Sequence, residues 1–290
     1  MFMLIFSITL PLYASLDEAK SYLAQTVTAD ANDTMSLTHA LDLQLETYLA
    51  TGKSNSVLQS AILSYENNHT FALASKILSA DDASSYLAKL KSIQSEDSGF
   101  GEEYGFQSTT LDTLLALKAL QQYESLENEL LLGIYSLMAN QSTDGYLSEM
   151  DGIASPYLTA LFVQLLAPYQ SRFSSTLKIA KNYLLAQLNR NTFELFIQAE
   201  ILDALLRVID DRDSLNTYLD VMQNAQLGNG SWENDPYITA IVLQTLTLAK
   251  NPNANPRYGS FSTTILDAET LDSIENVLVS INDRNYSSDE

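Results

Sequence analysis

The chain reads Gln94-Ser95-Glu96-Asp97-Ser98-Gly99-Phe100, then Gln141-Ser142-Thr143-Asp144-Gly145-Tyr146, then Gln226-Leu227-Gly228-Asn229-Gly230-Ser231-Trp232. Each stretch begins with glutamine and runs through a short polar segment to a glycine and an aromatic residue. An incomplete copy begins at Gln187 and lacks the glycine. Because a pattern that recurs at a regular period indicates stacked structural units, these stretches decide the fold.

An apolar segment rich in Ala and Leu follows each copy, and a more polar amphipathic segment precedes it. One small or apolar residue early in each apolar segment serves as an anchor, and two earlier segments fit the same frame. The six anchors recur at intervals of 32 to 46 residues: Ala40, Ala72, Leu114, Ala160, Ala199 and Ala240. This period is typical of helix pairs, in which each pair buries its apolar face against its neighbours.

Residue types that favour the start of a helix occur at the same position in four of the repeats, five residues before the anchor. They are Asn67, Thr109, Ser155 and Asp235, all of which favour the N-cap position. Ser155 and Asp235 are each followed by Pro-Tyr, and proline favours the first helical position. The agreement between caps and anchors predicts that a helix begins at each of these positions.

The two helices of each pair differ in character. The first is more charged, as in residues 17–25 and 83–93, and the second is apolar over most of its circumference, as in 157–166 and 237–248. A helix that is apolar all round is buried on both sides. The sequence therefore predicts an all-α protein with the (α/α)6 toroid fold, a closed double-layered barrel of about six helix pairs. An open helical solenoid is the alternative.

Three segments are predicted along the chain. Residues 1–15 contain the apolar run MFMLIFSITLPLYA, which has the length of a signal peptide, lacks a basic start and is too short for a transmembrane helix. Residues 16–281 form the toroid domain, with a last helix over 268–281, and residues 282–290 form a polar tail or linker. We expect an exported protein (secreted, periplasmic or on the cell surface) with no stable membrane span after signal removal. A buried first helix is the alternative for the apolar run.

The composition excludes several functions. The chain has 290 residues, with 36 Asp and Glu against 15 Lys and Arg, a formal net charge of −21, two histidines and no cysteine. Without cysteine there is no thiol nucleophile, no Cys-ligated zinc and no disulfide. An acidic chain also lacks the basic face that nucleic-acid binding needs. We expect no cofactor, no metal and no nucleic-acid partner.

The repeated pattern, with an aromatic residue eight positions before the glutamine (Tyr86 before Gln94, Tyr218 before Gln226), resembles the repeat of prenyltransferases and squalene/oxidosqualene cyclases. The stretch from Asn229 to Tyr237 is similar to the version found in exported bacterial repeat proteins of that superfamily. The resemblance covers residues 16–281, although only three units carry the pattern well. It implies an α/α toroid in which the glutamine and the aromatic residue join adjacent repeats, so these residues indicate a fold more strongly than an activity.

The catalytic motifs that this resemblance implies are missing. Class II cyclases protonate their substrate with Asp-x-Asp-Asp, and the nearest sequence here is Asp210-Asp211-Arg212-Asp213, which has a different spacing and falls where an inner helix should end. A solvated loop is the favoured interpretation of this segment. The zinc site of protein prenyltransferases and the thioester of complement-like toroids both need cysteine, which this chain lacks.

The inner helices of a closed barrel run in one direction, so their N-termini and partial positive charges gather at one mouth. The ligand-binding candidates at this mouth are His39, Tyr157, Trp232, Asp235 and Tyr237. Asp112 and Glu200 are the candidate catalytic acids, because a carboxylate within an apolar run must be paired or have a raised pKa. Each residue has a structural alternative: helix cap for Asp235, repeat packing for Trp232, core packing for Tyr157 and Tyr237, and a structural role for His39, Asp112 and Glu200.

Three functions remain open. The favoured one is a non-catalytic toroid that acts as a binding or structural module, with a small-molecule, glycan or protein ligand at the barrel mouth. The alternative is an enzyme, either a divergent terpene cyclase, which needs an acidic group with a raised pKa, or a carbohydrate-active α/α-barrel hydrolase or lyase, which needs two carboxyl groups across a cleft. A solenoid adaptor without a closed ring is the third.

Overall fold

The computed structural model describes residues 16–26, 56–149, 151–190, 193–209, 211–250, 278–281 and 284–287. The chain divides into two compact units, Met1–Ala254 and Asn255–Glu290. The predicted signal peptide (1–15), the first anchor Ala40 and the neighbouring His39 lie outside the described residues. No helix among the described residues is long and apolar enough to cross a membrane.

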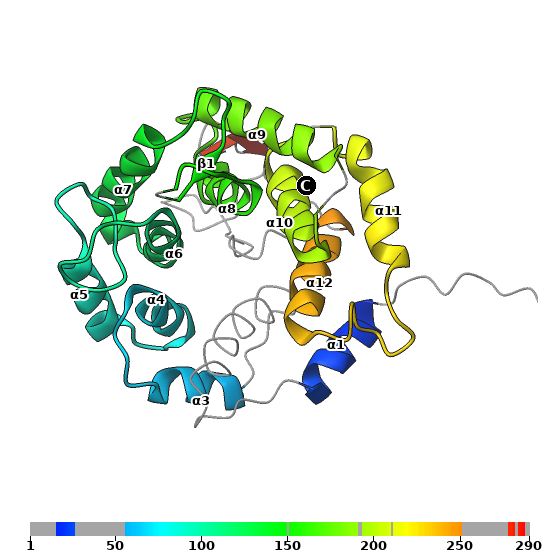
Figure 1. Ribbon diagram of the computed structural model, residues 1–290, viewed down its shortest axis with the longest axis horizontal. Coiled ribbons are helices and arrows are strands. Elements are labelled where there is room, and N and C mark those ends of the chain that lie inside the picture. Colours follow the sequence, from blue (N-terminus) through cyan, green and yellow to red (C-terminus); the bar gives the residue numbers. More distant parts are fainter. Residues whose placement is uncertain are drawn as a thin grey trace, which may run out of the picture. The chain divides into compact units, whose positions relative to one another are not determined.

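From α3 onward, the described helices of the first unit alternate between an outer and an inner layer (Figure 1). The outer helices are α1 (Leu16–Thr26), α3 (Ser56–Ser64), α5 (Ser84–Ile93), α7 (Glu127–Ala139), α9 (Ser174–Leu188) and α11 (Asn216–Asn224). The inner helices are α4 (Thr70–Ser79), α6 (Thr110–Leu120), α8 (Pro156–Leu166), α10 (Leu195–Val208) and α12 (Pro236–Lys250). Consecutive inner helices pack side by side from α4 to α12, inside the arc of the outer helices. The predicted all-α toroid is therefore confirmed, and each described inner helix contains its predicted anchor.

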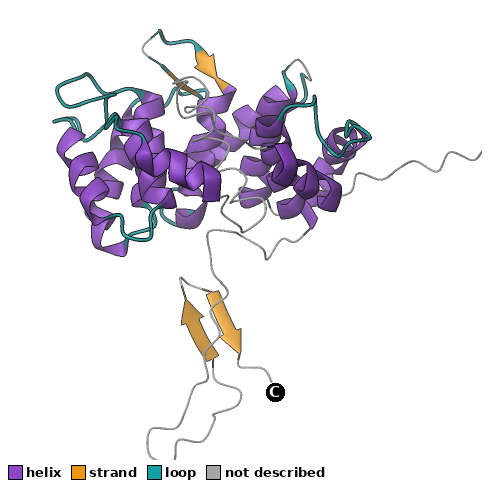
Figure 2. Cartoon of the chain, turned by 90° about the horizontal axis from the view of Figure 1, so that it is seen from below, coloured by secondary structure: helices purple, strands orange, loops and turns teal. Residues whose placement is uncertain are grey.

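Short elements connect the helices. Three 3₁₀ turns, η1 (Glu124–Leu126), η2 (Ala167–Tyr169) and η3 (Arg212–Leu215), lie between inner and outer helices. A small antiparallel hairpin of β1 (Leu147–Ser148) and β2 (Ala154–Ser155) precedes α8 and stands at one end of the helices (Figure 2).

Helix α1 packs against α12 and so joins the two ends of the first unit. The Tyr22 hydroxyl donates a hydrogen bond to the carbonyl of Asn234, 212 residues away. Gly230 lies so close to the α1 backbone that a Cβ atom there would be 2.6 Å from the Glu18 carbonyl carbon. A Cβ atom at Gly145 would likewise lie 2.3 Å from the carbonyl oxygen of Ile179 in α9. Thus α1 packs against the loop of the last repeat in the way that α9 packs against the loop of an internal repeat.

The repeated glutamines fold the loop before each inner helix in the same way. Each side-chain amide donates to the backbone carbonyl four residues on: Gln94 to Ser98 (3.0 Å), Gln141 to Gly145 (3.0 Å) and Gln226 to Gly230 (2.9 Å). The accepting residue has a positive φ in every copy: 66°, 94° and 86°. The residue two places further is fully buried in every copy: Phe100, Leu147 and Trp232. The structural repeat therefore aligns Leu147, not Tyr146, with the buried aromatic residues.

A threonine four residues after each helix cap holds this loop against the inner helix. Its hydroxyl donates to the carbonyl of the cap residue and accepts the backbone N–H of the buried loop residue, at 2.9 Å for Phe100, 2.9 Å for Leu147 and 3.0 Å for Trp232. These threonines are Thr113, Thr159 and Thr239. The loop follows the outer helix, so the threonine that bonds it lies on the side of the inner helix that faces the outer layer. The threonine therefore marks the outward-facing side of each inner helix.

Replacing Thr239 by valine should therefore destabilise the fold by about 1–3 kcal/mol, because the buried N–H of Trp232 loses its acceptor. Valine keeps the shape of threonine but cannot accept a hydrogen bond. Thr247→Val is the matched control on the same helix, since the hydroxyl of Thr247 bonds only the carbonyl of Leu243, one turn earlier. Urea denaturation followed by circular dichroism measures both, and equal losses in the two variants would contradict the assignment.

The predicted caps are confirmed at three positions and wrong at one. The side chains of Thr109, Ser155 and Asp235 accept the N–H of the residue three places on. Helix α4 instead begins after His69, whose Nδ1 accepts the N–H of Ala72 at 3.1 Å. Asn67 bonds the N–H of His69 and so shapes the turn before the cap.

Long polar side chains join the C-terminal ends of successive inner helices. Each comes from the segment after one inner helix and donates to a last-turn carbonyl of the next: Gln121 to Leu165 (2.9 Å), Gln170 to Arg207 (2.9 Å) and Arg212 to Leu248 (3.3 Å). These bonds satisfy carbonyls that the helix itself leaves free. They explain Arg212 in the acidic segment 210–213 as a structural residue.

The second unit contains β3 (Leu278–Ile281) paired antiparallel with β4 (Arg284–Ser287). The helix predicted for 268–281 is therefore wrong over 278–281, and residues 268–277 lie outside the described residues. The physical reason is the sequence: Val279 and Ile281 are β-branched, and the following residues, Asn282 and Asp283, are of types that disfavour a helix interior. The boundaries predicted at 15/16 and 281/282 stay predictions.

Candidate functional site

The inward-facing side of the inner helices follows from the threonine position. A helix turns by about 100° per residue, so the residues two, six and nine places after the cap lie opposite the threonine at place four. These places form three layers from the mouth inward. The first layer is Phe71, Leu111, Tyr157, Phe196 and Tyr237; the second is Ser75, Leu115, Leu161, Glu200 and Ile241; the third is Leu78, Lys118, Gln164, Asp203 and Gln244.

The first layer is apolar and mostly aromatic, and each of its residues is partly exposed. The rings of Tyr157 and Phe196, on neighbouring inner helices, meet edge to face with centroids 6.1 Å apart. Phe71 stacks on His69 at 6.2 Å. The structure thus places Tyr157 and Tyr237 at the mouth, where the sequence predicted them. Phe71 and Phe196 were missed, although their position two residues after a cap was a usable signal.

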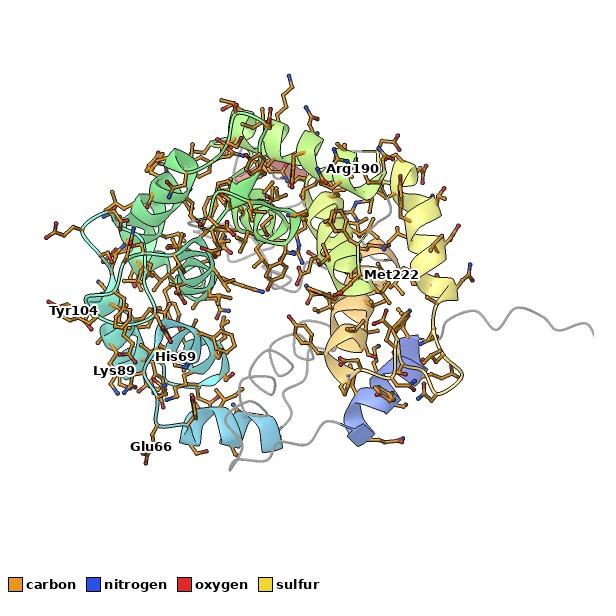
Figure 3. The ribbon with its side chains drawn as sticks, viewed as in Figure 1. Glu66, His69, Lys89, Tyr104, Arg190 and Met222 are labelled. Atoms are coloured by element: carbon orange, nitrogen blue, oxygen red, sulfur yellow. The ribbon has the colours of Figure 1, made fainter. Side chains whose placement is uncertain are left out.

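His69 and Asp112 form the polar rim of this mouth. The Asp112 carboxylate accepts the Thr109 hydroxyl at 2.8 Å and is half-buried. Burial raises the pKa of the Asp112 carboxyl against the effect of that hydrogen bond, and the charge of Glu102 raises it further. Burial lowers the pKa of His69, while Glu102, Asp112 and Glu103 act in the opposite direction and Lys76 in the same one. Figure 3 shows His69 at α4.

The lowered pKa of His69 predicts how the stability of the protein depends on pH. Its folded pKa lies below the ordinary 6.5, so the unfolded chain binds the proton more readily. The stabilisation is therefore complete above pH 6.5 and is lost as the pH falls through that value toward the folded pKa, where Nδ1 can no longer accept the N–H of Ala72.

Scanning calorimetry from pH 7.5 to 5 tests this expectation with His69→Asn, which keeps a cap but does not titrate. The wild-type melting temperature should fall more steeply with acidification than that of the variant. Asp112 has a raised pKa and acts in the opposite sense at lower pH, but both proteins share it. Parallel curves would show that His69 caps α4 without sensing pH.

Two carboxylates lie deeper on the same inward-facing side. Glu200 is 5 % exposed, and its Oε2 accepts the side-chain amide of Gln164 on α8 at 2.6 Å. Asp203 is 1 % exposed and forms a two-point ion pair with Arg207 one turn later, while Gln244 of α12 donates to its Oδ1 at 3.1 Å. Sequence reasoning singled out Glu200 but missed Asp203 and Arg207. The spacing 200, 203, 207 on one helical face was the available signal.

The remaining predicted site residues have structural positions. Trp232 is in the core with no exposed surface, and its indole N–H donates to the Met222 carbonyl at 2.8 Å, so a ligand cannot reach it without a rearrangement. This position corrects the placement of Trp232 at the mouth. Asp235 is the partly exposed cap of α12. His39 lies outside the described residues.

Two cavities, of about 290 and 550 Å³, lie on the outer side, between a loop of one repeat and the outer helix of the next. The smaller contains Glu149, whose carboxylate accepts the first N–H groups of α6, from Thr110 and Leu111. The larger is open and is lined by residues such as Tyr146, Tyr183 and Arg190. Neither includes a residue of the three inward-facing layers. Within the described ranges, no group of three or more His, Asp or Glu side chains is arranged to hold a metal ion.

The described helices of the first unit have the α/α toroid fold, which is also the fold of the terpene cyclases. Solved structures of MstE, a type II terpene cyclase from Scytonema, share it. The chain matches an MstE variant in complex with its substrate geranylgeranyl dihydroxybenzoate at TM-score 0.60 and 14% identity, covering 81% of this chain and 96% of that one. It matches apo MstE at TM-score 0.59 and 14% identity, covering 81% and 97%. No protein-family model and no curated protein matches the sequence.

Proposed function

We propose that this protein is a non-catalytic toroid that binds a neutral, apolar ligand of prenyl type at the mouth of its inner helices. The observation that carries the proposal is the first layer, in which each of the five described inner helices presents one apolar or aromatic side chain on its inward-facing side. Ligand sites are concave and mostly apolar, with few polar groups that orient the ligand. His69 and Asp112 supply such groups at the rim.

Charge and bonding favour a neutral ligand and a binding role. The net charge of −21 opposes the approach of an anion such as a diphosphate. The two deep carboxylates already have hydrogen-bond partners: Glu200 bonds Gln164 on α8, and Asp203 bonds Arg207 on its own helix and Gln244 on α12. A proton donor for cyclisation would have to break those bonds. The ligand in the similar MstE structure, geranylgeranyl dihydroxybenzoate, carries a prenyl chain.

Calorimetric titration with farnesol, a prenyl alcohol, tests the proposal. Replacing Tyr237 or Phe196 by alanine should weaken binding about 10- to 100-fold, since each change removes a large apolar contact. Tyr104→Ala is the control, because Tyr104 is 80% exposed and lies at the outer edge of the helices (Figure 3). Equal affinities for all variants, or no saturable binding by the wild type, would contradict a ligand site at the mouth.

A second candidate function rests on Asp112, the half-buried rim carboxyl with a raised pKa. A carboxyl that holds its proton nearer neutral pH is a candidate general acid, as a divergent cyclase would need. In that case a prenyl substrate would be converted, and Asp112→Asn would abolish conversion without weakening binding. The carbohydrate-active alternative needs a second carboxyl across a cleft, and release of reducing sugar from glycans would support it.

We also propose that the protein is exported after its N-terminal apolar segment is cleaved. The apolar run ends at Ala14, one residue before the predicted boundary at 15/16, and α1 begins at Leu16, so cleavage after Ala14 would leave α1 whole. Leu23 and Ala19 of α1 are buried in the toroid core. Mass spectrometry of the protein recovered from outside expressing cells should show Ser15 as its first residue. Recovery only inside the cells with residues 1–14 present would contradict export.

A further inference from the structure

One buried acceptor on the inward-facing side has no hydrogen-bond partner. Gln244 of α12 is 6 % exposed, and its side-chain oxygen Oε1 is the one buried side-chain polar atom left unpaired among the described residues. The nitrogen of the same amide donates to Asp203 Oδ1 at 3.1 Å. The unpaired oxygen therefore lies beside the pair formed by Asp203 and Arg207.

The orientation of this amide is fixed by its neighbour. The Asp203 carboxylate pairs with Arg207 through both oxygens and so needs donors on that side. A reversed amide would direct its oxygen at the carboxylate and lose the bond. Gln164 occupies the same layer on α8, but it donates to Glu200 and has no buried side-chain atom left unpaired. The third layer thus contains two similar glutamines, and of these Gln244 has a buried side-chain oxygen that receives no hydrogen bond.

A buried acceptor without a donor costs about 1–3 kcal/mol, so a donor from outside the described residues is favoured there. A hydroxyl group fits better than an ammonium group: it supplies one donor and brings no charge, whereas burying a further charge is costly. Gln244 lies seven residues after Tyr237 on the same helix face, which is about 10 Å below the first layer. Ile241 lies between them on that face.

We propose that Gln244 Oε1 accepts a hydrogen bond from a hydroxyl group at the inner end of an apolar ligand, so that the ligand class is a long-chain alcohol rather than a hydrocarbon or an ether. This inference rests on the proposed function, because it adds the polar end of the ligand whose apolar body lies at the mouth. Recognition of the hydroxyl then comes from α12 and recognition of the chain from the first layer.

The test compares farnesol with farnesyl methyl ether, which has the same chain but no donor. The wild type should bind the alcohol about three- to tenfold more tightly, the effect of one hydrogen bond. Gln244→Met, which keeps the volume of the side chain, should bind both equally. Gln164→Met is the matched control and should keep the preference. Melting temperatures establish that each variant is folded, and the wild-type comparison needs no variant.

Each outcome has one meaning. If the wild type binds both probes equally, the acceptor is not a ligand contact and this inference is overturned while the proposed function stands. If neither probe binds, the proposed function itself fails. If all three proteins prefer the alcohol, another group recognises the hydroxyl and the assignment to Gln244 is wrong.

Discussion

Arg207→Met should lower the free energy of unfolding by about 3–5 kcal/mol, the cost of leaving one member of a buried ion pair without its partner. The Arg207 and Asp203 side chains are 3 % and 2 % exposed, so water cannot take the place of the guanidinium. Methionine keeps the apolar stem of arginine and removes the charge. The remaining bond from Gln244 does not compensate a buried carboxylate.

Two further variants isolate the charge effect. The double variant Arg207→Met with Asp203→Leu should recover most of the loss, because a pair replaced by apolar residues leaves no uncompensated charge. Arg172→Met should cost under about 1 kcal/mol, since Arg172 is exposed and lies over the rings of Tyr135 and Phe173. Trp232, the single tryptophan, is fully buried and reports unfolding by fluorescence. A loss in the double variant as large as in the single one would show that Arg207 acts through packing.

Gly145→Ala is the second substitution with a large expected effect. It should lower the free energy of unfolding by about 2–5 kcal/mol. Gly145 has φ of 94°, where a side chain is strained, and a Cβ atom would lie 2.3 Å from the carbonyl oxygen of Ile179 in α9. That neighbour is backbone and cannot rotate away. The substitution must therefore separate the loop from α9, and with it the contact between two adjacent repeats.

Gly228→Ala is the control, because nothing lies within 4 Å of a Cβ atom there and its φ is not positive. It should change the stability by less than about 1 kcal/mol. Thermal unfolding of both variants by circular dichroism gives the comparison. A Gly145→Ala variant as stable as Gly228→Ala would mean that the loop and α9 are not in tight contact.

The repeat made most of the toroid predictable, because local chemistry and fold agree at each copy. Glutamine, loop glycine and cap recur together, and the structure uses them together: Gln226 bonds the loop, Gly230 approaches α1, and Asp235 caps α12. Pro-Tyr after a cap placed Tyr157 and Tyr237 at the mouth for the same reason. Such agreement across levels is what allows a single sequence to specify its fold.

Prediction failed at two positions, at one because of a contact with the next repeat and at the other because of the register of a loop. Helix α4 is capped by His69 rather than by Asn67, because Thr70, its first residue, is bonded to the carbonyls of Gly101 and Glu102 in the next repeat. Leu147 rather than Tyr146 is buried because the loop register is counted from Gln141. Neither relation is visible within one copy.

The deep site was only half predictable. An acidic residue in an apolar run indicated Glu200, but its partner Gln164 lies on another helix and its role depends on how α8 and α10 face each other. The unpaired oxygen of Gln244 could not be found from the sequence, because only the bond to Asp203 fixes which end of the amide is free. Sequence patterns place residues on a helix face, whereas hydrogen bonds across helices need the assembled structure.

The chemical fate of a bound prenyl ligand tests the central claim most directly. The protein is incubated with farnesol, free ligand is removed, and the bound fraction is extracted and analysed by gas chromatography with mass spectrometry. We predict a saturable bound fraction that is lost in Tyr237→Ala and is recovered as unchanged farnesol. Recovery of a cyclised product that disappears in Asp112→Asn, or the absence of any saturable bound fraction, would contradict a non-catalytic binding toroid.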